Sequence, residues 1–391
     1  MLKLNTKGIQ CINDCSIDEP IIVRLSSNVN LPNALKKNEF LLVNHNSMKD
    51  IPRGFKGYFI TEDQSLSIDI PSDLSNIFLL PNDQDYLGDS DVVRFDPVQL
   101  KLKTIYRKSS KHNSILVTER CNNYCIMCSQ PPRDIDDSYI AQDILKAIPL
   151  MSRDTNELGI TGGEPTVIGD DLFKIIRACK NYLPESSLHM LSNGRNFSKM
   201  EFVEKVAEIN HPDFMIGIPL YSDISSIHDY VVQADGAYDE TIRGILNLKS
   251  KKQLVELRVV IHKQTYKRLP QLAEFITRNL LFVDHVALMG LEMIGFTRAN
   301  LDDLWIDPIE YKEELRKAVE ILARFKMNVS VYNHQLCLVD KAILPFYRKS
   351  ISDWKNEYMT ECEPCTKKDE CGGFFSSASY RYSEHIKAFN E

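Results

Sequence analysis

Strand-like and helix-like segments alternate along the chain after about residue 114, and this alternation is the strongest constraint on its fold. Six short apolar runs of the kind that form strands begin near Ser114, Leu158, Ser187, Phe214, Glu256 and His285. Each is followed by an amphipathic stretch with helical spacing, at residues 140–151, 170–183, 200–209, 238–249, 270–279 and 308–325. Six such units favour a parallel sheet covered by helices and fall short of the eight units of a full barrel. We therefore predict an α/β fold with an open, partial (β/α)6 TIM barrel.

The two flanking regions have different patterns. Residues 1–107 contain short β-rich runs at 21, 40, 58, 77 and 92, which predict a small N-terminal β domain. A polar linker at 108–113 precedes the barrel, which we place at residues 108–326. Residues 327–391 hold one more strand candidate, at 328–332, and four of the ten cysteines. Because a loop-rich segment this short has a small core, we expect it to be a third, metal-dependent module.

Composition excludes some classes of protein. The chain has 47 Lys and Arg against 54 Asp and Glu, so it lacks the basic surplus typical of nucleic-acid binding. Met1 to Gln10 lacks the apolar core of a signal peptide, and no apolar run reaches the roughly 18 residues that span a bilayer. We therefore expect a cytoplasmic protein without nucleic-acid or membrane partners. In that compartment cysteines are ligands or buried thiols more often than disulfides.

A cysteine-rich loop follows the first predicted strand. The run at 115–118 leads directly into Cys121, Cys125 and Cys128. Three thiolates in one loop can hold a 4Fe–4S cubane and leave its fourth iron without a protein ligand. The alternative is a zinc knuckle, but zinc sites normally use four ligands, often in paired Cys-x-x-Cys groups. We predict an iron–sulfur cluster with one open iron.

This loop resembles that of the radical S-adenosylmethionine (SAM) superfamily, in which three cysteines with this spacing follow the first strand of a partial barrel. The resemblance implies that the open iron binds the amino and carboxylate groups of SAM. It further implies reductive cleavage of SAM to methionine and a 5'-deoxyadenosyl radical, which removes hydrogen from a substrate. In such enzymes the cofactors carry the reaction, while the protein supplies placement and excludes water.

A second motif stands at the end of the next predicted strand and consists of Gly162, Gly163, Glu164 and Pro165. Paired glycines let a backbone approach a ligand closely, and a carboxylate suits a charged amino group. The motif resembles the one that binds the SAM ammonium group in the superfamily. A Gly-Gly turn is common by itself, so its position one strand after the cysteine loop carries the interpretation.

Four other residues are candidates for contacts with SAM. Ser192 and Asn193 resemble a polar pair that contacts the SAM ribose in related enzymes, although Asn-Gly is also a frequent turn. Ser222 and Arg258 lie where related enzymes often place groups for the SAM carboxylate, which an arginine can bind through two hydrogen bonds. An ordinary surface salt bridge is the alternative for Arg258. The segment 290–296 is expected either to line the adenine pocket or to form a packed turn.

The C-terminal cysteines form a third pattern, with Cys337 followed by Cys362, Cys365 and Cys371. It resembles the auxiliary-cluster domains of peptide-modifying radical SAM enzymes, called SPASM or, in shortened form, twitch. The full SPASM form needs seven cysteines for two clusters, and only four are present. The resemblance implies one auxiliary 4Fe–4S cluster held by these four residues, with a structural zinc ion as the alternative.

The remaining cysteines and several histidines are expected to be structural. Cys179 falls on the apolar stripe of a predicted helix, and Cys11 and Cys15 have no third ligand nearby. Three histidines without metal-ligand spacing are expected at the surface or hydrogen-bonded in the core: His228, His262 and His285.

Longer strings narrow the resemblance to the His-Xaa-Ser system radical SAM maturase family. They are HNSILVTERCNNYCIMCSQPP from His112, SISDWKNEY from Ser350 and CEPCTKKDECGGFF from Cys362. The prolines after Gln130 and the segment around Trp354 point to this family, although they could simply shape a turn and pack the tail. The resemblance implies a peptide maturase that modifies, by crosslinking, a ribosomally made His-Xaa-Ser precursor peptide. It also implies a second radical SAM protein, a small accessory protein and a low-potential electron donor as partners.

Two rival interpretations remain open. The chain could be a radical SAM enzyme that acts on a small molecule or nucleotide. Alternatively, it could be a non-catalytic, zinc-binding interaction protein. Iron and sulfide content and deoxyadenosine release separate the second rival from an enzyme, and product analysis separates the first from a peptide maturase.

Overall fold

The structure is a computed structural model that describes residues 4–43, 50–65, 70–349 and 357–390. Its chain packs into two compact units. The first, here called the β-rich unit, comprises Met1–Ile115, Ser138–Leu158 and Lys174–Ser186. The second, here called the barrel unit, comprises Leu116–Asp137, Gly159–Phe173 and Ser187–Glu391. These units interleave along the sequence, and the three domain boundaries drawn from composition remain a prediction.

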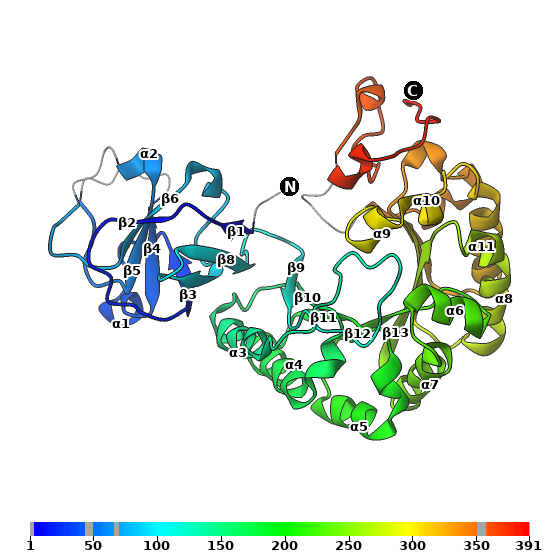
Figure 1. Cartoon of the computed structure of the whole chain (residues 1–391), viewed down its shortest axis with the longest axis horizontal. Coiled ribbons are helices and arrows are strands. Elements are labelled where there is room, and N and C mark those ends of the chain that lie inside the picture. The colour runs from blue at the N-terminus through cyan, green and yellow to red at the C-terminus, as the bar shows by residue number, and fades with distance from the viewer. Residues whose placement is uncertain (1–3, 44–49, 66–69, 350–356, 391) are drawn as a thin grey trace. The chain divides into compact units, whose positions relative to one another are not determined.

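The β-rich unit is built on an eight-stranded mixed sheet of order β1-β8-β7-β3-β4-β5-β6-β2 (Figure 1). Strands β3 to β6 run parallel to one another, whereas β7, β8, β1 and β2 pair antiparallel. The five predicted β-rich runs all form strands: β3 (Ile21–Ser26), β4 (Glu39–Val43), β5 (Gly57–Thr61), β6 (Ile77–Leu80) and β7 (Val92–Asp96). The others are β1 (Asn5–Thr6), β2 (Gln10–Cys11) and β8 (Lys101–Tyr106).

One face of this sheet carries an aromatic core. Phe40, Phe59, Phe78 and Phe95 are fully buried, and each comes from a different strand. The rings of Phe78 and Phe95 lie 4.5 Å apart and meet edge-on, a geometry that adds to the stabilisation from burial alone. Two short helices, α1 (Asn33–Lys36) and α2 (Glu62–Ser65), lie in the connections between strands. The β-rich character predicted for this region is therefore present in the structure.

The second sheet has seven strands in the order β15-β14-β13-β12-β11-β10-β9. All six predicted strands are found: β9 (Asn113–Leu116), β10 (Glu157–Thr161), β11 (Ser187–Leu191), β12 (Phe214–Pro219), β13 (Leu254–Ile261) and β14 (His285–Gly290). The strand candidate in the tail, β15 (Val329–Tyr332), pairs parallel with β14 and adds a seventh strand to the six expected. This parallel sheet with its helices confirms the predicted α/β fold class.

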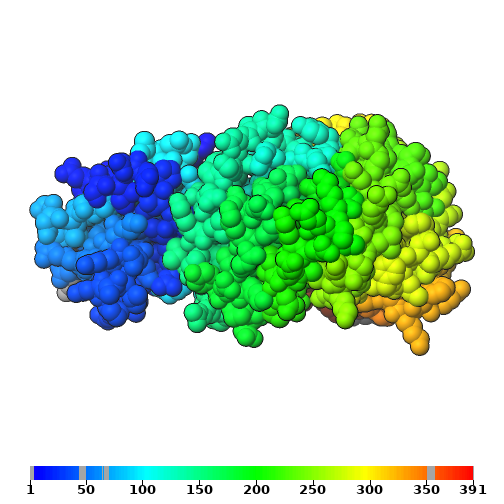
Figure 2. Space-filling model, turned by 90° about the horizontal axis from the view of Figure 1, so that it is seen from below, coloured from blue at the N-terminus to red at the C-terminus, as the bar shows by residue number. Residues whose placement is uncertain are grey.

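Helices occupy the predicted ranges between these strands. They are α3 (Ser138–Ala147), α4 (Asp170–Tyr182), α5 (Met200–Ile209), α7 (Ala237–Ser250), α8 (Leu269–Asn279) and α11 (Lys312–Arg324). Three others were not predicted: α6 (Ser225–Val232), α9 (Phe296–Ala299) and α10 (Leu301–Leu304). Helices α5, α7, α8 and α11 follow the outer side of the sheet in Figure 1, and Figure 2 shows their residues as a closed green-to-yellow surface.

The strands of this sheet present two chemically different faces. On β13, Val255, Leu257, Val259 and Ile261 are buried and apolar, as expected for side chains that pack under helices. The alternate positions of the strands form the opposite face of the sheet, which we call the lumen face. The strand register places these residues on it: His189, Gly217, Glu256, Arg258, His285 and Ser330. This face is polar, whereas the helix-covered face is apolar.

The C-terminal segment after β15 is held together by short turns rather than by long elements. It contains the 3-10 helices η6 (Leu336–Leu338), η7 (Lys341–Phe346), η8 (Thr360–Cys362) and η9 (Ser376–Ser379). Trp354 and residues 350–356 around it lie outside the described residues. Among the helices that the structure describes, none is both long and apolar enough to cross a membrane.

Candidate active site

The cysteine loop begins at the carboxyl end of β9, where buried Asp137 fixes the backbone that leads into it. The Asp137 carboxylate accepts hydrogen bonds from Thr118 Oγ1 at 2.8 Å, from Arg120 Nε at 3.0 Å and from the Glu119 amide. Burial opposes the charge on Asp137, but these donors and the Arg120 charge lower its pKa below the usual value. The residues just before Cys121 are therefore anchored by an ionised carboxylate.

Two distant segments hold the rest of the loop. The end of α6 accepts hydrogen bonds from the amides of Tyr124 and Ile126, at 3.1 and 3.0 Å. From the other side, the segment after β14 contributes three bonds: Phe296 N to Cys128 O at 2.8 Å, Thr297 Oγ1 to Met127 O at 3.0 Å and Asn300 Nδ2 to Ile126 O at 2.8 Å. The loop's shape is therefore set by residues more than a hundred positions away.

Gly295 allows the segment 290–296 to approach the cysteine loop closely. Its φ of +58° is a conformation that other residues adopt rarely, and a Cβ there would lie 2.3 Å from the Cys128 carbonyl oxygen. The ring of Phe296 stacks on that of Tyr124, with centroids 6.4 Å apart. The segment is thus packed on the loop, and its expected place beside an adenine remains a prediction.

The paired glycines of the second motif pack against the same stretch of backbone. A Cβ on Gly162 would lie 2.6 Å from Thr118 O, and one on Gly163 would lie 2.3 Å from Arg120 O. The Gly163 amide donates to Thr118 O and the Glu164 amide donates to Arg120 O, both at 2.9 Å. Within the chain, the glycines bring the end of β10 against the residues that enter the cysteine loop.

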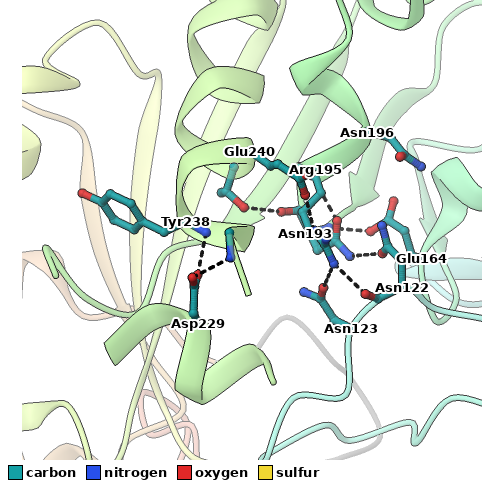
Figure 3. Close-up of polar contacts among 12 residues, drawn as sticks. Asn122, Asn123, Glu164, Asn193, Arg195, Asn196, Asp229, Tyr238 and Glu240 are labelled. Carbon is teal, nitrogen blue, oxygen red and sulfur yellow. Dashed lines mark hydrogen bonds and ion pairs between the residues drawn. The ribbon is translucent and has the colours of Figure 1, made fainter. Parts of the chain in front are cut away.

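Glu164 connects the second motif to the third. Its fully buried carboxylate accepts hydrogen bonds from the Thr166 amide and hydroxyl, from Ser192 Oγ at 2.8 Å and from the Asn193 amide at 2.6 Å. Burial raises the pKa of Glu164, and these donors counteract the rise. Figure 3 shows this contact between Glu164 and Asn193. Pro165, also buried, begins the short helix that Glu164 caps.

Arg195 was not singled out from the sequence, although it closes the string that contains Ser192 and Asn193. It donates to Asn122 O at 2.6 Å and to Asn123 Oδ1 at 2.7 Å, and its Nε lies 2.5 Å from a carboxylate oxygen of Glu240 (Figure 3). Asn193 Nδ2 also donates to Asn122 Oδ1, at 2.6 Å. The structure therefore brings the cysteine loop, the Gly-Gly-Glu-Pro motif and the Ser-Asn pair into one network.

The two candidates for the SAM carboxylate occupy different settings. Ser222 is fully buried and its Oγ accepts the Ile224 amide at 3.1 Å, so it shapes the start of α6. Arg258 lies on the lumen face of β13, where its two terminal nitrogens contact Glu256 Oε1 at 2.7 Å and the Met289 sulfur at 3.2 Å. The expected alternative of a surface salt bridge is wrong for Arg258, because Glu256 is buried.

Burial disfavours the thiolate form of Cys121 and Cys125, as it does for the core cysteine Cys179. All three thiols of the cysteine loop are half-buried and free. Burial raises the pKa of Cys121 to about 11 and that of Cys125 to about 12, and the neighbouring Glu164 adds to the rise at Cys121. Metal binding at such thiols must displace protons. The donor set, three sulfurs in one loop, fits a 4Fe–4S cluster with an iron left open.

The four C-terminal cysteines line one apolar cavity with an empty volume of about 320 Å³. Cys337, Cys362, Cys365 and Cys371 come from three separate turns and are all free. Around them lie Leu336, Tyr358, Phe374, Ile386 and Phe389. Amide hydrogen bonds also reach the sulfurs, from Leu336 and Gly373 to Cys371 and from Phe389 to Cys365. Four sulfurs around one apolar cavity fit the predicted auxiliary cluster.

A structural zinc ion is the alternative occupant of these four cysteines. Among the residues that the structure describes, no group of three or more His, Cys, Asp and Glu side chains is placed to hold a single metal ion, and this includes the three-cysteine loop. Iron, sulfide and zinc analysis of the reconstituted protein separates a cluster from a zinc ion.

A larger cavity adjoins the four-cysteine cavity, with which it shares Gln335 and Phe374. Its empty volume is about 660 Å³, and it opens at the carboxyl ends of β13, β14 and β15, where Ile261, Gly290 and Asn333 line it. Trp305 and Arg381 form part of its rim, with the guanidinium 5.1 Å from the indole centroid.

Cys179 is buried in α4, which confirms its predicted packing role, and Cys11 and Cys15 are exposed. The expectation for His262 was wrong. It is fully buried, and neither ring nitrogen has a hydrogen-bond partner in the described part of the chain.

Comparison with known proteins finds similarity in the region of the cysteine loop. Residues 115–276 match the model of the Radical SAM superfamily. Among curated relatives, Fe-coproporphyrin III synthase of Methanosarcina barkeri is 25% identical over 48% of this chain and 47% of its own length. Pre-heme d1 synthase of Dinoroseobacter shibae is 29% identical over 40% of this chain and 38% of its own length. The matched region thus spans less than half of either relative.

Solved structures with a similar fold include SuiB of Streptococcus suis bound to S-adenosylmethionine. Its TM-score is 0.48 and its identity is 18%, over 58% of this chain and 51% of the SuiB chain. Another is anSMEcpe with bound AdoMet and a peptide, with a TM-score of 0.43 and 15% identity over 56% and 62% of the two chains. The family match and the predicted cysteine loop agree in residue range. The match covers less than half of this chain and includes the cysteine loop, the Gly-Gly-Glu-Pro motif and the Ser-Asn pair.

Proposed function

We propose that this enzyme is a peptide maturase that cleaves SAM reductively and modifies, by crosslinking, a ribosomally made precursor with His-Xaa-Ser repeats. The observation that carries the SAM-dependent part is the single network joining the cysteine loop to Glu164, Ser192 and Asn193. When bound, the cluster and SAM supply a one-electron cleavage that starts carbon-radical chemistry. The chain's own task is to hold them and to keep water away.

In this proposal Cys121, Cys125 and Cys128 hold the first cluster. Gly162 to Pro165 receive the SAM amino group, while Ser192 and Asn193 receive the ribose. Ser222 and Arg258 receive the SAM carboxylate. The fully buried Glu164 is expected to act through the positions of Ser192 and Asn193, because its oxygens already accept four hydrogen bonds.

The second cluster is assigned to Cys337, Cys362, Cys365 and Cys371. It is supported by the apolar cavity that these four cysteines share. Its position beside the larger cavity would place an electron acceptor close to a bound substrate, since the two cavities share Gln335 and Phe374. The electron donor and the protein partners proposed from the family resemblance would bind elsewhere.

The reaction class is tested by anaerobic reconstitution with iron and sulfide, followed by measurement of deoxyadenosine. Cys125→Ala should abolish its release, because the loop then has two sulfur ligands. Cys15→Ser is the matched control, since that thiol is exposed and outside the loop, and it should retain wild-type release. A wild-type enzyme without deoxyadenosine, or with stoichiometric zinc in place of iron, would remove the proposal.

The peptide substrate is tested by co-expression with the encoded precursor and mass spectrometry. Arg381→Ala should reduce modification of the precursor while leaving SAM cleavage intact, because Arg381 stands at the rim of the larger cavity. Lys317→Ala, a change of an exposed cation on α11, is the control. An unchanged precursor mass together with active SAM cleavage would count against a peptide substrate.

A small-molecule substrate is the second candidate, and the curated relatives favour it. The names of both relatives refer to haem-type compounds. This alternative predicts that deoxyadenosine release rises on addition of the small molecule and not on addition of the precursor peptide.

A further inference from the structure

The lumen face of the sheet carries a group of charged and imidazole side chains of which the proposed function uses only Arg258. Glu256 is its centre. Its carboxylate lies 2.6 Å from His285 Nδ1, 2.7 Å from an Arg258 terminal nitrogen and 3.4 Å from His189 Nε2. These partners come from β11, β13 and β14, so the group joins three strands of the sheet.

The Glu256 carboxylate is ionised in this setting. Burial by itself would raise its pKa, but the neighbouring His189 and His285 and the charge of Arg258 lower the pKa well below its usual value. His285 is fixed in turn, because its Nε2 lies 2.9 Å from Ser330 Oγ on β15. Replacement of one member would therefore leave buried partners without their bonds, which costs more than a surface pair would.

Arg258 is the member closest to the proposed SAM site. Val260 lies two residues after Arg258, on the same face of β13 and nearer the cysteine loop. It packs in the apolar cluster that contains Met127, Tyr221 and Cys125. One alternation of a strand is about 7 Å. The Arg258 guanidinium thus lies below the loop, between the Glu256 group and the residues that pack on the cysteines.

A long arginine side chain needs such anchoring to present its charge in one place. Its guanidinium carries five N–H donors. The described contacts use the two terminal nitrogens, on Glu256 at 2.7 Å and on Met289 at 3.2 Å. The guanidinium therefore has more N–H donors than these two contacts use. A bidentate arginine contact depends strongly on orientation, so the anchor decides how well it forms.

We propose that Glu256, held by its hydrogen bond with His285, is a positioning residue that orients Arg258 toward the carboxylate of SAM. This inference rests on the proposed function, in which Arg258 receives that carboxylate. The competing role is purely structural, with the group serving only to tie the strands together.

The test uses the reconstituted enzyme and the variants Glu256→Gln, Arg258→Lys and the double variant. SAM affinity is measured by equilibrium dialysis, and deoxyadenosine release is measured as a function of SAM concentration. Glu256→Gln should weaken SAM binding about tenfold and raise KM while kcat stays within about twofold. The double variant should be little worse than Arg258→Lys alone, because both changes remove the same contact.

Glu39→Gln is the matched control. Glu39 is also a buried carboxylate paired with an arginine across neighbouring strands, Arg24, but it belongs to the β-rich unit. Its substitution should leave SAM affinity unchanged. As a conservative variant, Glu256→Asp keeps the charge and should recover part of the affinity.

The outcomes separate the inference from the proposed function. If Glu256→Gln lowers thermal stability and leaves SAM affinity and KM at wild-type values, the group is structural and the inference is overturned. If effects of Glu256→Gln and Arg258→Lys on affinity simply add, they act independently and the inference also fails. If the wild-type enzyme itself does not bind SAM, the proposed function fails first.

Discussion

Gly163→Ala tests the close approach between the second motif and the backbone that enters the cysteine loop. The added Cβ would lie 2.3 Å from Arg120 O and 2.7 Å from Arg120 C, whereas ordinary contact begins at 3.4 Å. Both of these Arg120 atoms belong to the backbone, so one of the two backbone segments must move by about 1 Å. Overpacking of this kind costs about 1–3 kcal/mol, and loss of the Gly163 hydrogen bond to Thr118 O adds about 1 kcal/mol. Alanine also makes the unfolded chain stiffer than glycine does, which offsets about 0.4–1 kcal/mol of the loss in stability.

We therefore expect Gly163→Ala to lower the free energy of unfolding by about 2–3 kcal/mol. Tryptophan fluorescence during urea unfolding is a suitable assay, because both tryptophans, Trp305 and Trp354, belong to the barrel unit by residue range. Gly236→Ala is the control. It has a φ of +74° but no atom within 4 Å of the added Cβ, so only the left-handed backbone should cost about 1 kcal/mol. A loss at Gly163 no larger than that at Gly236 would refute the reasoning.

Two further predictions concern other parts of the chain. Burial raises the pKa of Asp91 to about 6, against bonds from the Gly88 and Lys108 amides, so its folded pKa exceeds the unfolded one near 3.8. The stability that protonated Asp91 contributes is fully present below the unfolded pKa and is lost as pH rises to about 6. The free energy of unfolding should fall by about 3 kcal/mol over this range. Hydrogen exchange of the β-rich unit measures this pH dependence, which should disappear in Asp91→Asn. Cys371→Ala should reduce iron and sulfide after reconstitution to about half while deoxyadenosine release continues, since the first cluster is intact. Equal iron in the Cys371 variant and in a Cys11→Ser control would contradict the second cluster.

The strands of the parallel sheet could be predicted because their local signal is strong. Buried parallel strands need apolar residues on both faces, and runs such as LVELRVVI at 254–261 stand out from the polar helical stretches between them. The strand at 329–332 was recognised as well, but its membership of the same sheet depends on pairing with β14. The local sequence pattern does not specify which strand β15 pairs with.

The Glu256 group was missed although a signal for it existed. Glu256 and Arg258 interrupt an apolar run at alternate positions, which places both on one face of the strand. A charged pair on a strand otherwise buried on both sides requires a buried partner. Naming that partner as His285, some thirty residues later, required the register between β13 and β14.

The candidate site was predicted through its motifs, but the roles of individual residues within the chain were not. Gly162 and Gly163 were expected to approach a ligand, and the structure adds a close approach to the backbone at 118–120. Glu164 was expected to meet an amino group, which stays a prediction, and the structure adds hydrogen-bond donors from the chain itself around its carboxylate. Such contacts depend on how loops from different strands meet, which local spacing does not specify.

The bonds from Thr297 and Asn300 to the cysteine loop have a consequence for biosynthesis. These partners follow the loop by 170 and 174 residues. A growing polypeptide therefore exposes its three thiols long before the residues that shape them leave the ribosome. Iron delivery should follow completion of the chain, and protection of the nascent thiols from oxidation becomes a requirement for making active enzyme.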